Sequence, residues 1–310
     1  MFNHLKAQFP GPVGTLGTTA IYKDSSIFVA WATHCTVQRG YMDISNPSLG
    51  FTSVGDSSMA LGIAGSNGVV SLGDGGSAIL TFDYPIMNGP GFDFAVFENA
   101  FNDNFLELAF VEVSSDGVNF FRFPATSYTQ TNTQIGPFDN LGDATKINNL
   151  AGKYRNFYGT PFDLEELAGN PLLDINAITH VKIIDVVGSI NPLYASYDSN
   201  NNPINDPFPT PFASGGFDLD AIGVIHQNTT TKQTFENQKV FKIYPNPIQP
   251  NQRITIECKE NSIELLVLNS LGEIVYFGKE KTLDFSFPKG MYIIKVFTPN
   301  EVGIQKIIIE

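Results

Sequence analysis

Apolar residues along the chain recur in short runs with a period of two, and the turns between these runs are rich in Gly, Asn and Asp. Alternation is clearest at residues 77–82 and 109–114, whereas residues 180–187 are nearly all apolar, as in a central strand. One short helix is expected at residues 163–168, where Gly169 stops it. Further strands are expected at residues 69–72, 93–98, 120–123 and 217–225.

Many short strands without a strand–helix rhythm predict an all-β protein. A chain of 310 residues favours two domains over one. We expect residues 9–227 to form an antiparallel jelly-roll-like β-sandwich. The polar stretch 228–239 is interpreted as a linker, and residues 240–310 as a small immunoglobulin-like β-sandwich.

Charge is divided unevenly between these two parts. Residues 1–228 carry 8 basic and 22 acidic side chains, a net of −14, whereas residues 229–310 carry 10 and 9, a net of +1. Because the front domain is this acidic, it cannot hold a phosphate backbone by charge. Nucleic acid is therefore not expected as a partner. The acidity fits a calcium-rich exterior, or it serves solubility alone.

The cysteines, the hydropathy and the first residues bear on disulfide bonding, membrane insertion and export. Cys35 and Cys258 fall in different predicted domains, which argues against a disulfide scaffold, and both are interpreted as small buried residues. No apolar run reaches the about 20 residues that span a bilayer. The first six residues are too short and polar for a signal peptide. Ala7 and Gln8 are similar to a cleavage junction, so we expect the true start to lie upstream.

The last seventy residues carry three motifs in a fixed order. The segment begins with a Tyr-Pro-Asn-Pro run, has a Gly turn in its middle, and closes with a Lys-Gly-Met-Tyr strand. In this order it resembles the type A C-terminal sorting domain of the type IX secretion system of Bacteroidetes. The resemblance implies a secreted or surface protein that the export machinery recognises, then cleaves or anchors. The residues that carry it are Tyr244, Pro245, Asn246, Pro247, Gly272, Gly290 and Tyr292.

The front domain carries a second resemblance, over most of residues 60–225. It is similar to bacterial cell-surface protein domains, and its strand and hairpin at 111–120 resemble those of galactose-binding-like jelly rolls. Surface proteins of this kind are also loosely associated with cobalamin uptake. The phrases that carry the resemblance are residues 71–77, 88–91, 97–101, 107–117, 149–154 and 214–222.

Acidic residues in or beside apolar strands are the first candidate for chemistry. Asp218 and Asp220 are two residues apart on one strand, so they are expected on one face, with Phe217 and Leu219 in the core. Buried carboxylates are costly unless they are paired or bound to metal, and Ca²⁺ takes six to eight oxygen ligands. The alternative is that these acids are solvated or cap the backbone. The candidate Ca²⁺ ligands are Asp218, Asp220, Asp74 and Glu98.

Aromatic residues in two long segments are the second candidate. Residues 188–216 form a loop too long to be a plain connection, and residues 132–158 form another. Rings stack on the apolar faces of sugars while amides take hydroxyls. The alternative is that the rings pin the loops to the sandwich. The candidate ligand-binding residues are Tyr154, Arg155, Tyr158, Tyr194, Tyr197, Phe208 and Phe212.

Three functions stay open at this stage. A non-catalytic binder of a glycan or matrix component predicts a shallow aromatic-lined face. Capture of a small nutrient such as cobalamin predicts a broad apolar surface, and a glycoside hydrolase predicts a cleft with two converging carboxylates. The four histidines show no metal-binding spacing, and no nucleophile motif is present, so we expect a binder rather than an enzyme.

Overall fold

The computed structural model describes residues 9–230, 241–249, 252–258, 263–270, 272–297 and 302–310. The chain divides into two compact units, Met1–Gln233 and Thr234–Glu310, which are described separately below as the front unit and the tail unit. The predicted linker lies mostly outside the described residues.

The front unit contains two large antiparallel sheets. The first has the order β1-β11-β6-β13-β2, with β4 also paired to β13; the second has the order β3-β5-β12-β7-β8. The first sheet is built from β1 (Ile21–Tyr22), β2 (Ala30–Trp31), β4 (Val70–Ser71), β6 (Phe94–Glu98), β11 (Tyr158–Phe162) and β13 (Asp218–Val224). The second is built from β3 (His34–Gln38), β5 (Ser77–Ile86), β7 (Ala109–Ser114), β8 (Phe121–Arg122) and β12 (Ile178–Asp185).

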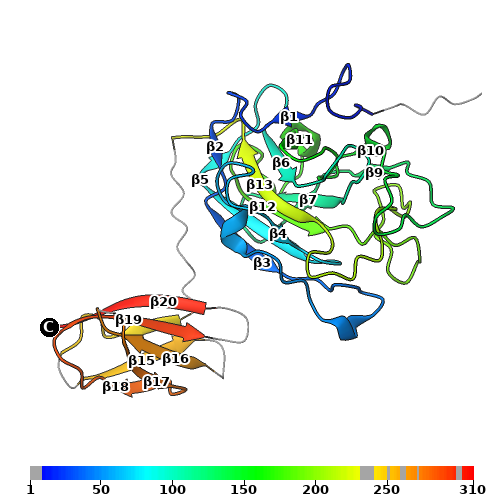
Figure 1. Cartoon of the computed structure of the whole chain (residues 1–310). Helices are drawn as coiled ribbons and strands as arrows, with labels where there is room; N and C mark the ends of the chain where they lie inside the picture. The colour runs from blue at the N-terminus through cyan, green and yellow to red at the C-terminus, as the bar shows by residue number, and fades with distance from the viewer. Residues whose placement is uncertain (1–8, 231–240, 250–251, 259–262, 271, 298–301) are drawn as a thin grey trace, which may run out of the picture. The chain divides into compact units, whose positions relative to one another are not determined.

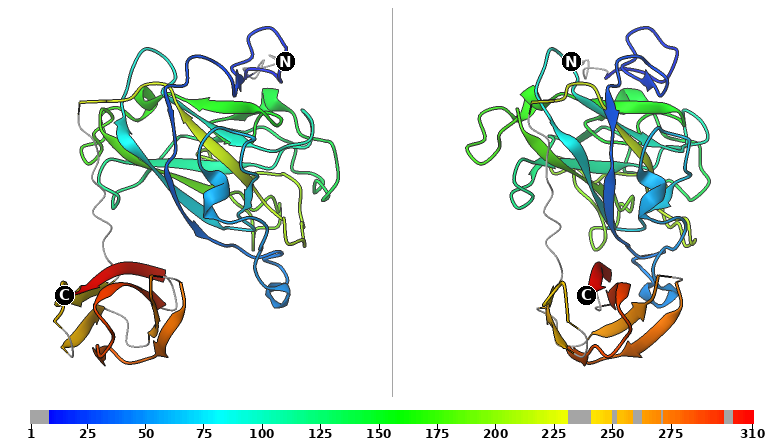
Figure 2. Two further views of the ribbon diagram at one scale, coloured as in Figure 1. Left: turned by 60° about the vertical axis from the view of Figure 1, so that its left-hand side comes forward. Right: turned by 90° about the vertical axis from the view of Figure 1, so that its left-hand side faces the viewer.

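These two sheets pack face to face and enclose the main core (Figures 1 and 2). Val96 and Leu219 from the first sheet and Leu80 and Val181 from the second are fully buried in it. The sequence expectation that Phe217 and Leu219 point into the core is confirmed, since both have no exposed surface. A hydrophobic core between two antiparallel sheets defines a β-sandwich, and the predicted all-β class is confirmed.

The helices of the front unit are single 3₁₀ turns. The helix expected at residues 163–168 is one of them, and its first turn is capped by the Asp163 carboxylate, which accepts from the Glu165 amide at 3.0 Å. No helix in the described part of the chain is long and apolar enough to cross a membrane. The turns are η1 (Pro47–Leu49), η2 (Ser57–Ala60), η3 (Ala144–Lys146) and η4 (Leu164–Leu167).

Long loops leave the sandwich between the strands, and they carry the candidate site. One joins β6 to β7, another runs from the small hairpin of β9 (Thr126–Ser127) and β10 (Ile147–Asn148), and the third joins β12 to β13. In Figure 1 the second and third are the green and yellow-green loops beyond the strand ends.

The tail unit is a second, smaller sandwich. Its sheets have the orders β14-β15-β18 and β17-β16-β19-β20, and they share a core that includes Ile254, Leu265, Ile294 and Phe285. The strands are β14 (Phe241–Tyr244), β15 (Arg253–Cys258), β16 (Glu264–Leu268), β17 (Ile274–Gly278), β18 (Thr282–Asp284), β19 (Gly290–Phe297) and β20 (Val302–Ile309).

Candidate functional site

A cleft in the front unit gathers residues from all three long loops. Its volume is about 300 Å³, within the range of roughly 300–1,000 Å³ that small-ligand pockets occupy. We call it the acidic cleft, because Glu107 and the buried Asp218 both line it. Its other lining residues are Asn99, Ala100, Phe101, Asn102, Phe105, Pro137, Phe138, Asn140, Thr210, Phe212 and Ser214.

Four phenylalanines stand around the cleft in two pairs. Phe101 and Phe105 lie with ring centroids 6.1 Å apart, and Phe138 and Phe212 lie 5.6 Å apart. Phe101 and Phe138 are 83% and 72% exposed, and Phe212 is 40% exposed. Large apolar rings held in water at the rim of a concave site give a ligand surfaces on which to stack.

Amide hydrogen bonds join the first two cleft loops. The Asn102 side-chain amide donates to Asn140 Oδ1 at 2.8 Å, and Asn104 donates from its side chain to the Gly142 carbonyl at 2.9 Å. The Gly142 amide returns a bond to the Asn104 carbonyl at 2.7 Å. These contacts fix the two loops against each other without a ligand, so the cleft is preorganised.

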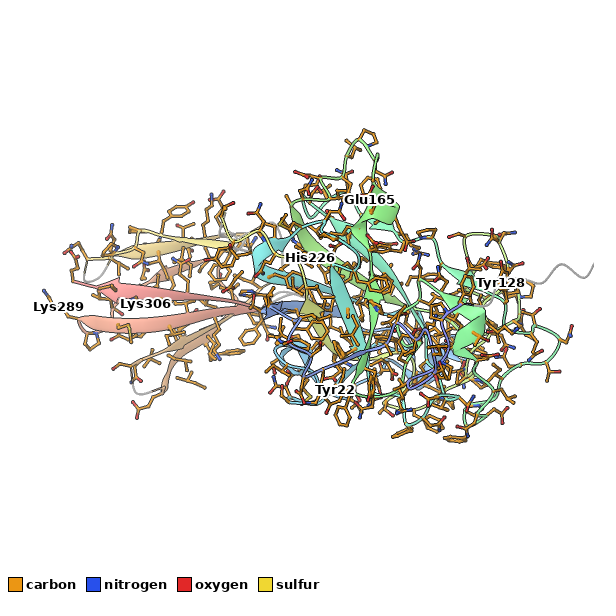
Figure 3. All side chains as sticks on the ribbon, turned by 90° about the horizontal axis from the view of Figure 1, so that it is seen from above. Tyr22, Tyr128, Glu165, His226, Lys289 and Lys306 are labelled. Carbon is orange, nitrogen blue, oxygen red and sulfur yellow. The ribbon has the colours of Figure 1, made fainter. Side chains whose placement is uncertain are left out.

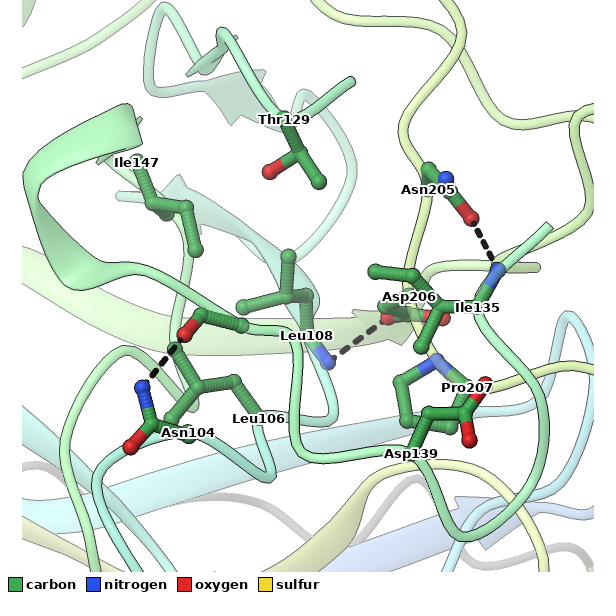
Figure 4. Close-up of a pocket in the computed structure, with 11 residues that line it drawn as sticks. Asn104, Leu106, Leu108, Thr129, Ile135, Asp139, Ile147, Asn205, Asp206 and Pro207 are labelled. Atoms are coloured by element: carbon green, nitrogen blue, oxygen red, sulfur yellow. Dashed lines mark hydrogen bonds between the residues drawn. The ribbon is translucent and has the colours of Figure 1, made fainter. Parts of the chain in front are cut away.

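The third loop is anchored by buried polar side chains (Figure 4). Asn205 Oδ1 accepts from the Ile135 amide at 3.0 Å, and Asp206 Oδ2 accepts from the Leu108 amide at 3.0 Å. Both side chains have 5% exposure or less. The long loop therefore has a defined conformation, set by side chains that replace the backbone ladder of a strand.

Behind the cleft lies a group of six carboxylates that act electrostatically on one another. Like charges at close range oppose the ionisation of their neighbours. Arg39 lies near enough to lower the pKa of Asp218, but its guanidinium already donates to backbone carbonyls of Val54, Ser71 and Gly55. The six, which we call the acid group, are Asp74, Glu98, Glu107, Asp185, Asp206 and Asp218.

Backbone amides satisfy part of this acid group. Asp185 accepts from the Phe217 amide at 2.7 Å and from the Gly75 amide at 3.0 Å, while Glu98 Oε2 accepts from the Ala100 amide at 2.7 Å. Of the seven buried side-chain atoms without a hydrogen bond among the described residues, three lie in or beside this group: Ser71 Oγ, Glu98 Oε1 and Asp218 Oδ1. Such atoms cost roughly 1–3 kcal/mol each when unsatisfied.

Burial dominates the protonation of the acid group. It raises the pKa of Asp74 and of Asp218 to about 6 and holds that of Glu98 well above its usual range. For Glu107 burial is again the largest cause, followed by repulsion from Asp218. After burial, which raises the pKa of Asp218, the side chains of Ser71 and Asn99 lower it, since both can donate a hydrogen bond to the carboxylate.

These raised pKa values predict that the front unit loses stability as the pH rises. The neutral acid is favoured in the folded state, so stability is highest near the usual pKa of 3.8 and falls as the pH passes through the folded value of about 6. Two such shifts predict a loss of about 3 kcal/mol or more between pH 4.5 and pH 7.5. Trp31 is the single tryptophan of the chain and lies in β2, so its fluorescence during urea unfolding reports on this unit. A flat or rising stability over that interval would contradict the account.

The four residues predicted as Ca²⁺ ligands do not share one environment. Asp218 lies with Glu98 in the acid group, and Asp74 lies next to Asp185 and accepts from the Ile44 amide at 2.8 Å. Asp220 instead accepts from the Gly65 amide at 2.9 Å on both oxygens. Asp218 and Asp220 thus have different contacts, and the pairing of β13 with β6 shifts register between Leu219 and Ala221. A metal site that both residues share stays a prediction.

Calcium binding at the acid group stays a prediction. The orphaned oxygens of Glu98 and Asp218 are of the type that Ca²⁺ prefers. In the part of the chain that the structure describes, however, no group of three or more His, Cys, Asp or Glu side chains is arranged to hold a metal ion.

The aromatic residues predicted to bind a ligand lie in different environments, and only one of them lines the acidic cleft. Phe212 lines the acidic cleft. Tyr154 and Phe208 are 1% and 8% exposed, and the Tyr154 hydroxyl lies 2.8 Å from Thr19 Oγ1, so these two rings pin loops instead of facing a ligand. That part of the prediction is corrected: apolar rings in a long loop gain more free energy from burial than from exposure.

The remaining predicted residues lie away from the cleft lining. Arg155 forms an ion pair with Asp103 at 2.5 Å and lies over the Tyr158 ring at 5.4 Å, which fixes both side chains on the surface. Tyr194 is half-buried and Tyr197 is 39% exposed. Their ligand-binding role stays a prediction.

The sequence also held signals for cleft residues that were not recognised. Residues 97–101 and 107–117 were singled out as phrases of a surface-protein family, and they contain Phe101 and Glu107. Asn99 lies in the first of these phrases as well, whereas Phe105, Phe138, Asn102 and Asn140 lie in no such pattern. A larger hollow elsewhere in the front unit, beside Phe9 and Thr145, has no ionisable residue among those that line it.

In the tail unit, the Tyr-Pro-Asn-Pro segment is fixed against the last strand. Asn246 donates from its side chain to the Lys306 carbonyl at 2.8 Å and accepts from the Ile308 amide at 3.1 Å, as a strand neighbour would. Tyr244 at the end of β14 keeps 48% exposure. Figure 3 shows Lys289 and Lys306, both exposed, on this unit.

The other two sequence features of the tail also have structural reasons. Gly272 lies in the turn between β16 and β17 with φ +81°, a conformation that favours glycine, and Gly290 begins β19 with φ +154°. Tyr292 is buried against Phe285 and Phe287, and its hydroxyl donates to the Pro288 carbonyl at 2.8 Å. A small autonomous sandwich with an exposed first motif is suited to recognition by an export machine.

The tail unit is thus a small β-sandwich with a core of its own at residues 241–309. Residues 242–310 match the family model of the secretion system C-terminal sorting domain. The tail unit belongs to that family. The chain is therefore cargo of the type IX secretion system, located at the cell surface or outside the cell.

Comparison with solved structures gives distant likenesses only. PorZ, a surface component of the type IX secretion system of Porphyromonas gingivalis, is 12% identical with a TM-score of 0.21, and the match covers 81% of this chain and 31% of PorZ. A β-glucuronidase of Ruminococcus gnavus is 10% identical with a TM-score of 0.21, over 92% of this chain and 47% of the enzyme. That of Faecalibacterium prausnitzii is 9% identical with a TM-score of 0.22, over 93% and 47%. The chain spans less than half the length of these proteins, and no curated protein matches it significantly.

Proposed function

We propose that the front unit of this exported protein is a non-catalytic module that binds a carbohydrate in the acidic cleft. The observation that carries the proposal is the joint placement of four phenylalanine rings and two carboxylates around one preorganised cleft of about 300 Å³. Rings offer surfaces to the C–H faces of a sugar, while carboxylates accept from its hydroxyls.

The polar lining supports the same proposal. Side chains of Asn99, Asn102 and Asn140 and the hydroxyls of Thr210 and Ser214 add donors and acceptors to the cleft. Apolar walls with a few convergent polar groups are the usual composition of a small-molecule site. The lining does not favour capture of a nutrient such as cobalamin. That function predicts a broad apolar surface, whereas Glu107 and Asp218 place ionisable groups in this cleft.

Truncation of the rim rings tests the proposal. Phe138→Ala and Phe212→Ala are each expected to weaken oligosaccharide binding by about tenfold, from a stacking contribution of about 1–1.5 kcal/mol. Because Phe138 is 72% exposed, its removal should leave the unfolding free energy nearly unchanged. Isothermal titration calorimetry on the full chain measures the affinities, after a glycan array has supplied the ligand.

Leu193→Ala is the matched control for this pair. Leu193 is 80% exposed in the same long loop as Phe212, but it does not line the cleft. The Leu193→Ala variant should bind the oligosaccharide with the affinity of the unmodified chain. If both phenylalanine variants bind with the affinity of the unmodified chain, or if no glycan binds at all, the proposed site is overturned.

A glycoside hydrolase is the second candidate, and one observation favours it. Glu107 and Asp218 line the same cleft, and burial raises the pKa of both. Hydrolysis of a glycosidic bond uses such a pair, one protonated acid and one carboxylate. If the full chain hydrolyses a model glycoside and Glu107→Gln abolishes that turnover while the glycan still binds, the module is an enzyme and the non-catalytic proposal fails.

A further inference from the structure

The charge balance of the acidic cleft differs from that of an ordinary sugar site. Asp218 lines the cleft with 8% exposure, and its Oδ1 accepts no hydrogen bond. Glu98 lies behind it with 1% exposure, and its Oε1 is likewise unpaired. Two buried carboxylate oxygens without a donor define a place where a proton-bearing or positively charged group of a ligand would be stabilised.

Nearby basic side chains are already engaged. Arg39 donates to the Val54 carbonyl at 2.8 Å and to the Gly55 carbonyl at 2.5 Å. Arg155 is held by Asp103, whose Oδ2 lies 2.5 Å from its guanidinium. One guanidinium, that of Arg39, thus faces six acids, and burial and mutual repulsion favour their protonated forms. A ligand cation would stabilise their ionised forms.

The walls of the cleft indicate what kind of cation fits. A hydrated metal ion gains little from exposed phenylalanine rings, whereas an organic ammonium is attracted by the face of an aromatic ring as well as by a carboxylate. Phe101 and Phe138, on different loops, supply such rings at the rim. The described residues also hold no group arranged for a metal.

We infer that the acidic cleft selects a carbohydrate that carries a protonated amine, an amino sugar, with the ammonium directed at Asp218 and Glu107 and the sugar ring between the phenylalanine pairs. This inference rests on the proposed carbohydrate binding and specifies its ligand class. It assigns to Asp218 a role in specificity, because a neutral or N-acetylated sugar leaves the negative charge of the floor without a counter-charge.

Two oligosaccharides of equal length test the inference, a β-1,4-linked glucosamine oligomer and its fully N-acetylated form. Calorimetry on the full chain at pH 6.5 is expected to show at least tenfold tighter binding of the amine form. Raising the salt concentration should reduce that preference, since part of it is electrostatic. In Asp218→Asn and in Glu107→Gln the preference should shrink to threefold or less, whereas in Asp220→Asn, outside the cleft, it should persist.

The outcomes separate the inference from the function on which it rests. Equal or tighter binding of the N-acetylated or another neutral oligomer overturns the inference and leaves the carbohydrate site standing. If a polyamine without a sugar ring binds as tightly as the glucosamine oligomer, the ammonium recognition stands and the carbohydrate proposal fails. If none of these compounds binds, both fail.

Discussion

Asp218→Asn should make the front unit more stable and at the same time weaken its binding of an amine-bearing oligosaccharide at least threefold. At pH 7.5 the substitution removes a buried charge whose pKa is raised to about 6. The shift corresponds to about 3 kcal/mol, of which we expect about 2 kcal/mol to be recovered, or a rise of roughly 4–8 °C in the melting temperature of a unit this large.

Binding should respond in the opposite direction. The Asp218 carboxylate lines the cleft and carries an oxygen that the protein leaves unpaired, so its replacement removes the negative charge offered to the ligand. A stabilising change that weakens a function is the usual sign of a site held at a cost to the fold. Thermal unfolding followed by Trp31 fluorescence and calorimetric titration measure the two effects.

Asp220→Asn provides the comparison on the same strand. Burial raises the pKa of Asp220 to about 6 as well, but both its oxygens accept from the Gly65 amide, outside the cleft. Binding should therefore be unchanged in this variant. If Asp218→Asn lowers the stability by more than about 1 kcal/mol, or retains full affinity, the cleft has been misinterpreted.

Deletion of residues 242–310 is expected to eliminate the protein from the cell surface and the medium in a bacterium that carries the secretion system. These residues form the sorting domain, with a core of their own, so their removal takes away the export signal and leaves the core of the front unit intact. Immunoblots of cell and medium fractions, with surface proteolysis, measure the distribution. Undiminished surface exposure of the truncated chain would contradict the assignment.

Asp218→Asn with its tail retained is the control for this deletion. It should be exported as the unmodified protein is, because the substitution lies in the cargo and not in the signal. Transfer of residues 242–310 to an unrelated reporter with its own leader should in turn direct that reporter outward.

The longer core strands of the front unit could be predicted from alternating or continuous apolar runs, whereas β1, β2, β3, β9, β10 and β11 were not predicted. The runs at 109–114 and 217–225 correspond to β7 and β13 because one or both faces of each strand pack into the core, which imposes the pattern directly. The tail could be identified for a similar reason: its asparagine pairing, glycine turns and buried tyrosine are all local requirements that leave fixed residues in the sequence.

The acidic cleft could not be predicted in the same way, because loops with no periodicity assemble it. Phe101, Phe138 and Phe212 are separated by dozens of residues and meet through amide contacts such as that between Asn102 and Asn140. The different contacts of Asp218 and Asp220 could not be predicted for another reason. The two-residue repeat holds only for a regular strand, and the pairing of β13 with β6 shifts register between Leu219 and Ala221.

The central claim is that the ligand occupies the acidic cleft, and hydrogen exchange measured by mass spectrometry tests it most directly. The full chain is compared with and without the oligosaccharide that binds most tightly. The account predicts that bound ligand slows exchange in residues 99–107, 137–142 and 210–218 and leaves exchange in residues 154–158 unchanged. Protection confined to 154–158 or 194–204, with the three cleft segments unaffected, would contradict it.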